Sequence, residues 1–402
     1  MQNLKPISAT NPIVDKCIEC GYCEQVCPSA KLNLTPRQRI VIYRKLAEFR
    51  RLKQTKLYNY VKQRYKKYAV DSCATTGLCA NHCPVNINTG ELILQLKQKS
   101  NQSLARILGN HFAIFVKLNK VILKLIHALA RLIGKKRLYD LNHTTRKIIP
   151  LVPVYLPTLP LAQTAKFNSP KCSLTRPKIV YLPSCNNRIF ADASSAEAHT
   201  AVEQLLDKLG YAVIFPAELE NVCCGQLFNS AGYQAVARSK SAQIVAVLAK
   251  SDYPIIIDNS SCFNYLKQDA TVQNHFTDVT SFIFRHLDKL NLLPEYQNLA
   301  VHIDCSSIKL GQERQILDIL SHCATTITIP QGVTCCGFAG SKGFIHPELN
   351  RSALSGLAEQ ISACDIGVTC NRNCQIGLSF HGQKPYLSLA EVVLNCIAKP
   401  PR

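Results

Sequence analysis

The feature that most constrains this chain is a run of closely spaced cysteines near its start, in the stretch CIECGYCEQVCP. Cys17, Cys20 and Cys23 are separated by two residues each, and Cys27 follows after three more, directly before a proline. Structural zinc sites commonly take two separated cysteine pairs. The run is instead typical of an iron–sulfur protein, in which three thiolates hold one [4Fe–4S] cluster and the fourth cysteine ligates a second. It therefore predicts another motif downstream.

A second motif is present as CATTGLCANHCP, which supplies Cys73, Cys79 and Cys83. If the last cysteine of each motif ligates the other cluster, two ligand sets follow. The first set is Cys17, Cys20, Cys23 and Cys83. The second set is Cys27, Cys73 and Cys79, and its fourth position falls at Thr76, whose hydroxyl is a poor ligand for iron. We therefore expect two clusters, a [4Fe–4S] cluster and a second that is either [3Fe–4S] or completed by a non-thiol ligand.

The cysteine count and the lack of export signals indicate a reducing compartment. The chain has 20 cysteines, and its first residues lack the apolar core of a secretory signal. No run of about 18 uncharged apolar residues indicates a transmembrane helix. Clustered thiols in such a compartment more often bind metal than form disulfides. We expect a cytoplasmic protein, either free or peripheral on the inner face of the cytoplasmic membrane.

Positive charge is concentrated in the first part of the chain. Residues 1–150 contain 27 Lys and Arg against 7 Asp and Glu, a balance of +20, whereas residues 151–402 contain 20 against 19. A basic surface suits an anionic membrane, a nucleic acid or an acidic protein. No base-reading motif accompanies the charge, so no nucleic acid partner is expected.

The segment 104–137 combines basic and apolar residues and contains no acidic residue. A helical period places one set of basic side chains on one face: Lys117, Lys120, Lys124, His127, Arg131 and Lys135. We expect an amphipathic helix, which either lies on a membrane surface with its apolar side down or packs on the protein with a solvated lysine stripe. The proline-rich segment that follows predicts an extended linker. Between the cysteine motifs, Thr35 and Pro36 predict the start of a helix.

The C-terminal part contains an internal duplication, in which a Cys-Cys-Gly step (CCG) occurs once in each copy. Between the glycine of that step and the last cysteine of the copy, 36 residues intervene in both copies. The candidate metal-binding thiols of the first copy are Cys185, Cys223, Cys224 and Cys262. Those of the second are Cys305, Cys335, Cys336 and Cys374. Buried strands alternate with helical segments, which predicts an α/β fold with the cysteines after the strands.

These cysteines are candidates for a further iron–sulfur cluster at the CCG repeats. Cys370 is a candidate for an additional ligand among the thiols of the second copy. The remaining cysteines are expected to be ordinary buried thiols: Cys172, Cys323, Cys364 and Cys396. The expected organisation is an α-helical dicluster ferredoxin-like domain (residues 1–100), a basic helix and linker (101–170), and an α/β part made of two CCG repeats (171–290 and 291–402).

The phrases GLCANHCPVNINTG, YLPSCNNR, CCGFAGSKGFIHPEL and CNRNCQIGLS resemble the iron–sulfur part of FAD-linked D-lactate dehydrogenases of the cytochrome- or quinone-reducing kind. Iron–sulfur subunits of glycolate oxidase and of anaerobic glycerol-3-phosphate dehydrogenase are similar. The resemblance implies that this chain carries electrons from a partner flavoprotein to a quinone or cytochrome. It also implies that the FAD site and the catalytic residues lie outside this chain, in which no FAD is expected.

Two other functions stay open on the sequence alone. CCG repeats also resemble those of heterodisulfide reductases, but each copy here lacks the C-x-x-C ending, and Asn259 and Asn371 stand at its first position. The other alternative is a basic binding protein whose clusters are only structural.

Overall fold

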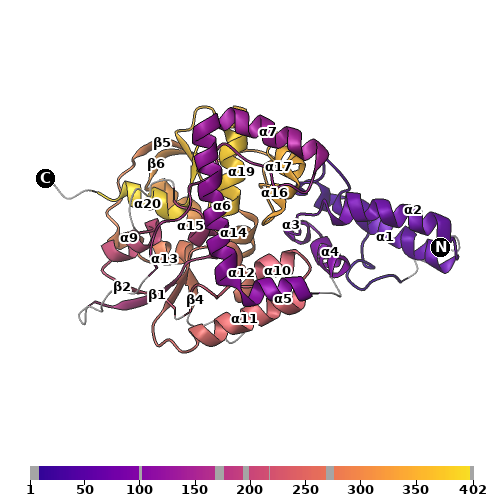
Figure 1. The fold of residues 1–402 in the computed structure, drawn as a ribbon, viewed down its shortest axis with the longest axis horizontal. Helices are drawn as coiled ribbons and strands as arrows, with labels where there is room; N and C mark the ends of the chain where they lie inside the picture. Colours follow the sequence, from indigo (N-terminus) through magenta and orange to yellow (C-terminus); the bar gives the residue numbers. More distant parts are fainter. Residues whose placement is uncertain are drawn as a thin grey trace.

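The computed structural model describes residues 9–98, 102–167, 176–192, 199–216, 218–268 and 276–398. The N-terminal part is helical, and the C-terminal part contains two parallel sheets covered by helices (Figure 1). This agrees with the expected helical domain followed by an α/β part. No helix of the described residues is both long and apolar enough to cross a membrane.

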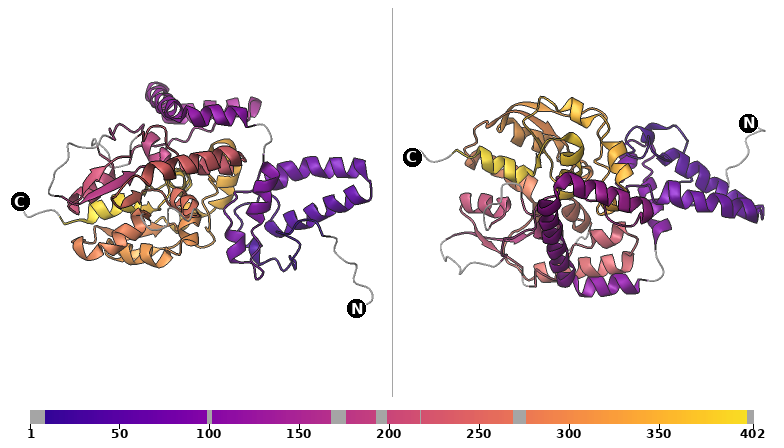
Figure 2. Two further views of the ribbon diagram at one scale, coloured as in Figure 1. Left: turned by 90° about the horizontal axis from the view of Figure 1, so that it is seen from below. Right: turned by 45° about the horizontal axis from the view of Figure 1, so that its top comes forward.

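The N-terminal helices hold the two cysteine motifs against the C-terminal body. Their bounds are η1 (Tyr22–Glu24), α1 (Pro36–Arg51), α2 (Thr55–Tyr65), the π-helical turn η2 (Lys66–Val70), α3 (Leu78–Asn81) and α4 (Thr89–Lys97). Thr35 and Gln38 form a reciprocal capping box at the start of α1, as expected for a threonine before a first-turn proline. The α1–α2 hairpin projects away from the rest of the molecule (Figure 2).

The basic segment forms three helices, so the expectation of one amphipathic helix was wrong. These are α5 (Ser103–Asn110), α6 (Phe112–Ile133) and α7 (Lys135–Ile148). The chain turns at Gly134, whose φ of 89° is a conformation that other residues rarely adopt. Helices α6 and α7 lie on the outside of the C-terminal body (Figure 2). Residues 149–167, the described part of the linker that follows, contain no regular element apart from an isolated bridge between Ala162 and Phe190.

The two sheets have the same topology, as an internal duplication predicts. The first contains β1 (Lys178–Leu182), β2 (Ala212–Ile214), β3 (Ile255–Ile257) and β4 (Phe276–Asp278) in the order β2-β1-β3-β4. The second contains β5 (Tyr296–Val301), β6 (Ala324–Thr328), β7 (Ile366–Val368) and β8 (Tyr386–Leu387) in the order β6-β5-β7-β8. All strand pairs within these sheets are parallel. One hydrophobic core joins both sheets, including Ile256 and Val301.

Helices alternate with the strands in both repeats. The first repeat contains α8 (Cys185–Ile189), α9 (Ala201–Lys208), α10 (Gln226–Ser230), α11 (Gln234–Leu248), α12 (Ser260–Leu266), α13 (Val279–Arg285) and the short η4 (Leu287–Lys289). The second contains α14 (Cys305–Lys309), α15 (Glu313–Ser321), α16 (Lys342–Ile345), α17 (Pro347–Ala353), α18 (Leu357–Gln360), α19 (Arg372–Gly382) and α20 (Leu389–Cys396). Helices α17 and α18 are separated by a turn that contains Gly356, whose φ is 78°.

Candidate metal centres

The first expected ligand set meets at one small cavity. The four cysteines of the set line this cavity together with Arg37 and Ile40. The cysteines are Cys17, Cys20, Cys23 and Cys83. Gly21, at φ 88°, turns the chain between the second and third of these cysteines. Burial and the nearby thiols of Cys79 and Cys17 raise the pKa of Cys23 to about 11. The cysteine motifs, which are far apart in sequence, therefore supply thiols to the same place.

Two thiols of the second set, those of Cys27 and Cys73, lie beside a buried arginine. The side chain of Arg39 is 1% exposed, and its Nη1 lies 3.6 Å from Sγ of Cys27. Burial alone would lower the pKa of Arg39. The negative charge of the Cys73 and Cys27 thiolates outweighs this effect, so the pKa is raised. Its other contacts are neutral, namely the hydroxyls of Ser29 and Ser72 and the carbonyl of Ala69.

Within the described residues, Arg39 has no hydrogen bond or ion pair with a carboxylate. A buried cation without an anionic partner is costly. An anionic metal–thiolate cluster held by Cys27, Cys73 and Cys79 would supply the missing negative charge. The residues present therefore fit the group that their spacing predicts. Thr76, at the fourth position, accepts a hydrogen bond from the Leu78 amide at 3.4 Å.

Two half-buried lysines flank Cys73. Lys342, from the second repeat, donates to the carbonyls of Asp71 and Cys73 at 2.5 and 2.7 Å. Burial and the neighbouring charge of Lys97 lower the pKa of Lys342 to about 7. Burial likewise lowers the pKa of Lys97. Both side chains therefore lie in a poorly solvated place beside the second set of thiols.

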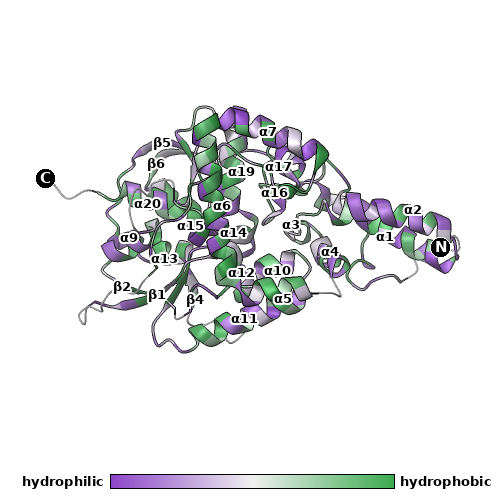
Figure 3. Ribbon diagram, in the orientation of Figure 1, coloured by the Kyte–Doolittle hydropathy of each residue, from purple (hydrophilic) through white to green (hydrophobic). Residues whose placement is uncertain are grey.

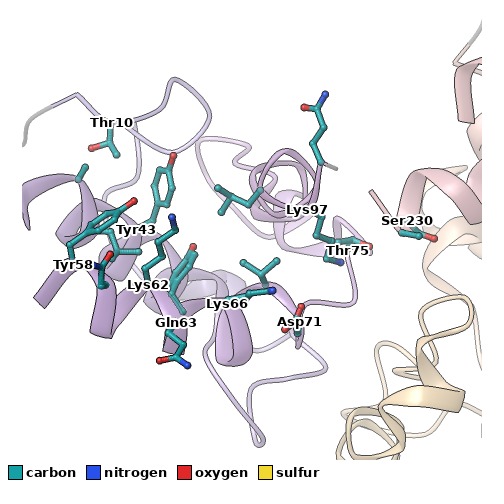
Figure 4. A pocket seen from close by; sticks show the side chains of 18 of the residues that line it. Thr10, Tyr43, Tyr58, Lys62, Gln63, Lys66, Asp71, Thr75, Lys97 and Ser230 are labelled. Atoms are coloured by element: carbon teal, nitrogen blue, oxygen red, sulfur yellow. The ribbon is translucent and has the colours of Figure 1, made fainter. Parts of the chain in front are cut away.

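A pocket of about 980 Å³ opens beside this region, between the α1–α2 hairpin and the C-terminal body. Figure 4 shows Tyr43, Tyr58 and Lys62 on one side of it and Thr75 and Lys97 on the other. Thr75 is two residues from Cys73, so the pocket adjoins the second set. Its wall combines aromatic rings with cationic groups.

The thiols of the first CCG repeat gather at the carboxyl ends of three parallel strands. Cys185 begins α8, after β1; Cys223 and Cys224 follow β2; and Cys262 lies in α12, after β3. The Sγ atoms of Cys224 and Cys262 are 3.2 Å apart. A hydrogen bond with Cys223, together with burial, raises the pKa of Cys185 well above its usual range. These four thiols form one group, in which Cys223 and Cys224 are buried and the other two are half-buried.

The second repeat builds the same arrangement from Cys305, Cys335, Cys336 and Cys374. The Sγ atoms of Cys336 and Cys374 are 2.9 Å apart, and a hydrogen bond joins Cys305 to Cys335. In both repeats the glycine of the CCG step is required by its backbone. Gly225 has a φ of 92°, and a Cβ there would lie 2.3 Å from the Ala237 carbonyl oxygen.

Sequence reasoning missed His302, which lies against the thiols of the second repeat. Its ring nitrogens offer one ligand atom that lies within 4.8 Å of the Sγ atoms of Cys336 and Cys374. Burial lowers the pKa of His302 to about 4, so the ring is neutral. The available signal was its position directly after the first strand of the repeat, three residues before Cys305.

The remaining cysteines lie elsewhere. Cys370 accepts a hydrogen bond from Thr280 at 3.6 Å and lies near Asp304, in a polar pocket between the repeats. These contacts do not include the four thiols of the second repeat. The expectation that Cys370 joins those thiols therefore finds no support. The other three described cysteines are buried in hydrophobic cores, as ordinary thiols would be; they are Cys323, Cys364 and Cys396. Cys172 lies outside the described residues.

The N-terminal motifs contact the second repeat. Val26 and Leu78, which lie beside cysteines of the second set, pack with Cys335 in one apolar cluster. Cys305 and Ile308 lie against the same cluster. The second repeat is therefore directly joined to the cysteine motifs.

Comparison with known families agrees with this geometry. Residues 13–87 match the 4Fe-4S dicluster domain, and residues 179–267 match the cysteine-rich domain named CCG. This chain is an iron–sulfur protein. It is 24% identical to the glycolate oxidase iron-sulfur subunit of Escherichia coli (strain K12), over 99% of this chain and 97% of that protein. It is 22% identical to lactate utilization protein A 1 of Bacillus mycoides (strain KBAB4), over 48% and 85%. It is 19% identical to a probable glycolate oxidase iron-sulfur subunit of Bacillus subtilis (strain 168), over 92% and 90%.

Proposed function

We propose that this protein is the iron–sulfur electron-transfer subunit of a dehydrogenase that oxidises a small 2-hydroxy acid, D-lactate or glycolate. The observation that carries the proposal is the direct contact between the N-terminal cysteine motifs and the thiols of the second repeat. Relatives named for glycolate oxidase and lactate utilization support the substrate class. The hydroxy acid is oxidised on a partner flavoprotein, which carries the FAD.

We assign the first cluster to Cys17, Cys20, Cys23 and Cys83, which line one cavity. The second cluster takes Cys27, Cys73 and Cys79, and its fourth iron site, at Thr76, has no thiolate. Each CCG repeat holds a further centre through its own four cysteines. Iron–sulfur clusters accept and release single electrons. These centres therefore take the two electrons of a reduced flavin one at a time.

The protein's own residues bind and tune these centres. The charge of Arg39 stabilises the second cluster most when that cluster carries its extra electron, because the guanidinium is shielded from water. Lys97 and Lys342 also lie beside Cys73, but burial lowers the pKa of both, so the fixed positive charge at this place is that of Arg39. This cation favours electron arrival at the second cluster. The adjoining pocket, with its aromatic and cationic wall, suits a planar quinone as the final acceptor.

Helices α5–α7 supply a surface for contact with an anionic membrane, where quinones and cytochromes are found. One face of α6 exposes apolar side chains, which we call the α6 apolar face: Ile114, Leu118, Val121, Leu125 and Leu132. The basic residues Lys117, Lys120 and Lys124 run along its edge. Figure 3 shows hydrophobic stretches along α5 and α6, on the outside of the molecule. An apolar face bordered by lysines favours peripheral binding to anionic lipids.

The alternative of a heterodisulfide reductase is less well supported. Asn259 and Asn371 replace the cysteines that such an enzyme has at these positions, and both cap helices. Their side chains accept hydrogen bonds from Ser261 N and Asn373 N, respectively. Asn371 Nδ2 also donates to Ser261 Oγ at 2.7 Å, across the contact between the repeats. These asparagines hold the two repeats together, and we assign them no role at the metal.

The proposal is tested by purifying the chain anaerobically, measuring iron and sulfide, and recording electron paramagnetic resonance spectra. We expect bound iron–sulfur clusters that are reduced by the partner flavoprotein when D-lactate or glycolate is added. Addition of the flavoprotein without substrate is the control. Colourless protein that binds only zinc, or clusters that the loaded flavoprotein cannot reduce, would contradict the proposal.

A further inference from the structure

A buried histidine of the second repeat has a ring nitrogen that no described residue satisfies. The side chain of His302 is 3% exposed, and its Nε2 makes no hydrogen bond with the described residues. The ring is hydrogen-bonded to the backbone of Val333. Leaving a buried polar atom without a partner is costly. Thiol sulfurs lie close to the ring, since a ligand atom of His302 and the Sγ atoms of Cys336 and Cys374 lie within 4.8 Å of one another.

The first repeat lacks this nitrogen. His302 precedes Cys305 by three residues, and Leu182 precedes Cys185 by the same number. Leu182 ends β1, and His302 directly follows β5, so the two occupy corresponding places at the ends of the central strands. Leu182 is buried in the hydrophobic core. The two thiol sites therefore differ in a side chain that can bind metal.

The surroundings of His302 are those of a metal ligand. Imidazole is a common ligand for iron. Histidines that ligate metals usually hydrogen-bond through their other nitrogen, often to a backbone carbonyl, and the contact with Val333 fits this pattern. In iron–sulfur proteins, replacing thiolate ligands by neutral imidazole raises the reduction potential.

We propose that Nε2 of His302 ligates iron in the second repeat, beside Cys336 and Cys374, so that the two repeats hold chemically different centres. This inference rests on the proposed iron–sulfur centre of the second repeat. The neutral ligand makes the second repeat the more oxidising of the two. That repeat is also the one in contact with the N-terminal motifs.

The test is pulsed electron paramagnetic resonance of the full-length, anaerobically reduced protein, with and without ¹⁵N-labelled histidine. We expect a strong nitrogen coupling that changes with the label. His302→Leu copies the first repeat and removes this coupling. His302→Cys substitutes an anionic ligand, so it removes the coupling and lowers the midpoint potential of the centre. The matched control is His82→Gln, which changes an exposed histidine beside Cys83 and leaves the coupling in place.

The outcomes separate this inference from the proposed function. The iron of the second repeat is measured as the difference between the natural protein and Cys335→Ser. If that iron is present and the natural protein shows no histidine coupling, His302 is not a ligand, and the proposed function stands. If the N-terminal clusters are present and the second repeat holds no iron, the proposed centre itself is wrong. The spectrum of the natural protein decides the question even if His302→Leu fails to fold.

Discussion

Thr334 donates its hydroxyl to the backbone carbonyl of Val26 at 3.2 Å, joining residues that are 308 positions apart in the chain. Val26 directly precedes Cys27, and Thr334 directly precedes Cys335. The hydrogen bond therefore ties a cysteine of the N-terminal motifs to a cysteine of the second repeat. Under the proposed function, electrons would pass between the two parts at this contact, so the iron content of each part is the first quantity to measure.

Cys335→Ser is expected to lower the iron bound per chain by the content of one centre and to leave the N-terminal clusters in place. The reason is that Cys335 is one of four gathered thiols, and a serine hydroxyl is a poor ligand for iron. Iron analysis and electron paramagnetic resonance measure the effect. Cys323→Ser is the matched control, because Cys323 is equally buried but lies in the hydrophobic core. Equal iron loss in both variants would contradict the assignment.

Arg39→Leu is expected to lower the midpoint potential of the second cluster and to destabilise the loaded protein by about 3–5 kcal/mol, the usual cost of removing one partner of a buried charge pair. Arg39→Lys keeps the charge but loses the planar contacts to Ser29 and Ser72. We expect it to retain most of the potential and to lose part of the stability. Redox titration followed by electron paramagnetic resonance measures the potentials. An unchanged potential in Arg39→Leu would show that the guanidinium does not act on the cluster.

The cysteine spacing predicted two sets of thiols, because closely spaced cysteines followed by a proline are typical of proteins with two iron–sulfur clusters. It also predicted that Cys83 of the second motif would join Cys17, and these two thiols line the same cavity. The shared order of the two sheets likewise follows from the repeated strand and cysteine pattern.

What the sequence could not predict depends on contacts between distant segments. Arg39 lies in a helix rich in exposed basic residues, and only tertiary packing makes it fully buried. His302 is a lone histidine whose neighbours Cys336 and Cys374 are brought to it by two other strands. The break at Gly134 was missed because the apolar and basic period continues across it, and the period alone does not report a glycine with positive φ.

Gly337→Ala is expected to destabilise the second repeat and to reduce its iron content. A Cβ at this position would lie 2.7 Å from the Leu349 carbonyl oxygen, and the residue has a φ of 69°. Overpacking of this kind costs about 1–3 kcal/mol beyond the backbone strain. Gly332→Ala is the control, because Gly332 has a φ of 73° but no atom within 4 Å of an added Cβ. Thermal unfolding should separate the two variants, and equal melting temperatures would contradict the steric argument.

Charge on the α6 apolar face is expected to abolish membrane binding. Leu125 and Leu132 are 64% and 82% exposed, so the double substitution Leu125→Glu and Leu132→Glu should leave the fold intact. It removes apolar contact with the lipid and adds negative charge. Flotation with phosphatidylglycerol-containing vesicles should detect binding of the natural protein. High salt should weaken this binding, because it screens the attraction between the lysines and the anionic lipid head groups. Leu293→Glu, at a site 56% exposed and outside α5–α7, is the control and should bind normally. If the double variant floats as well as the natural protein, this face does not contact the membrane.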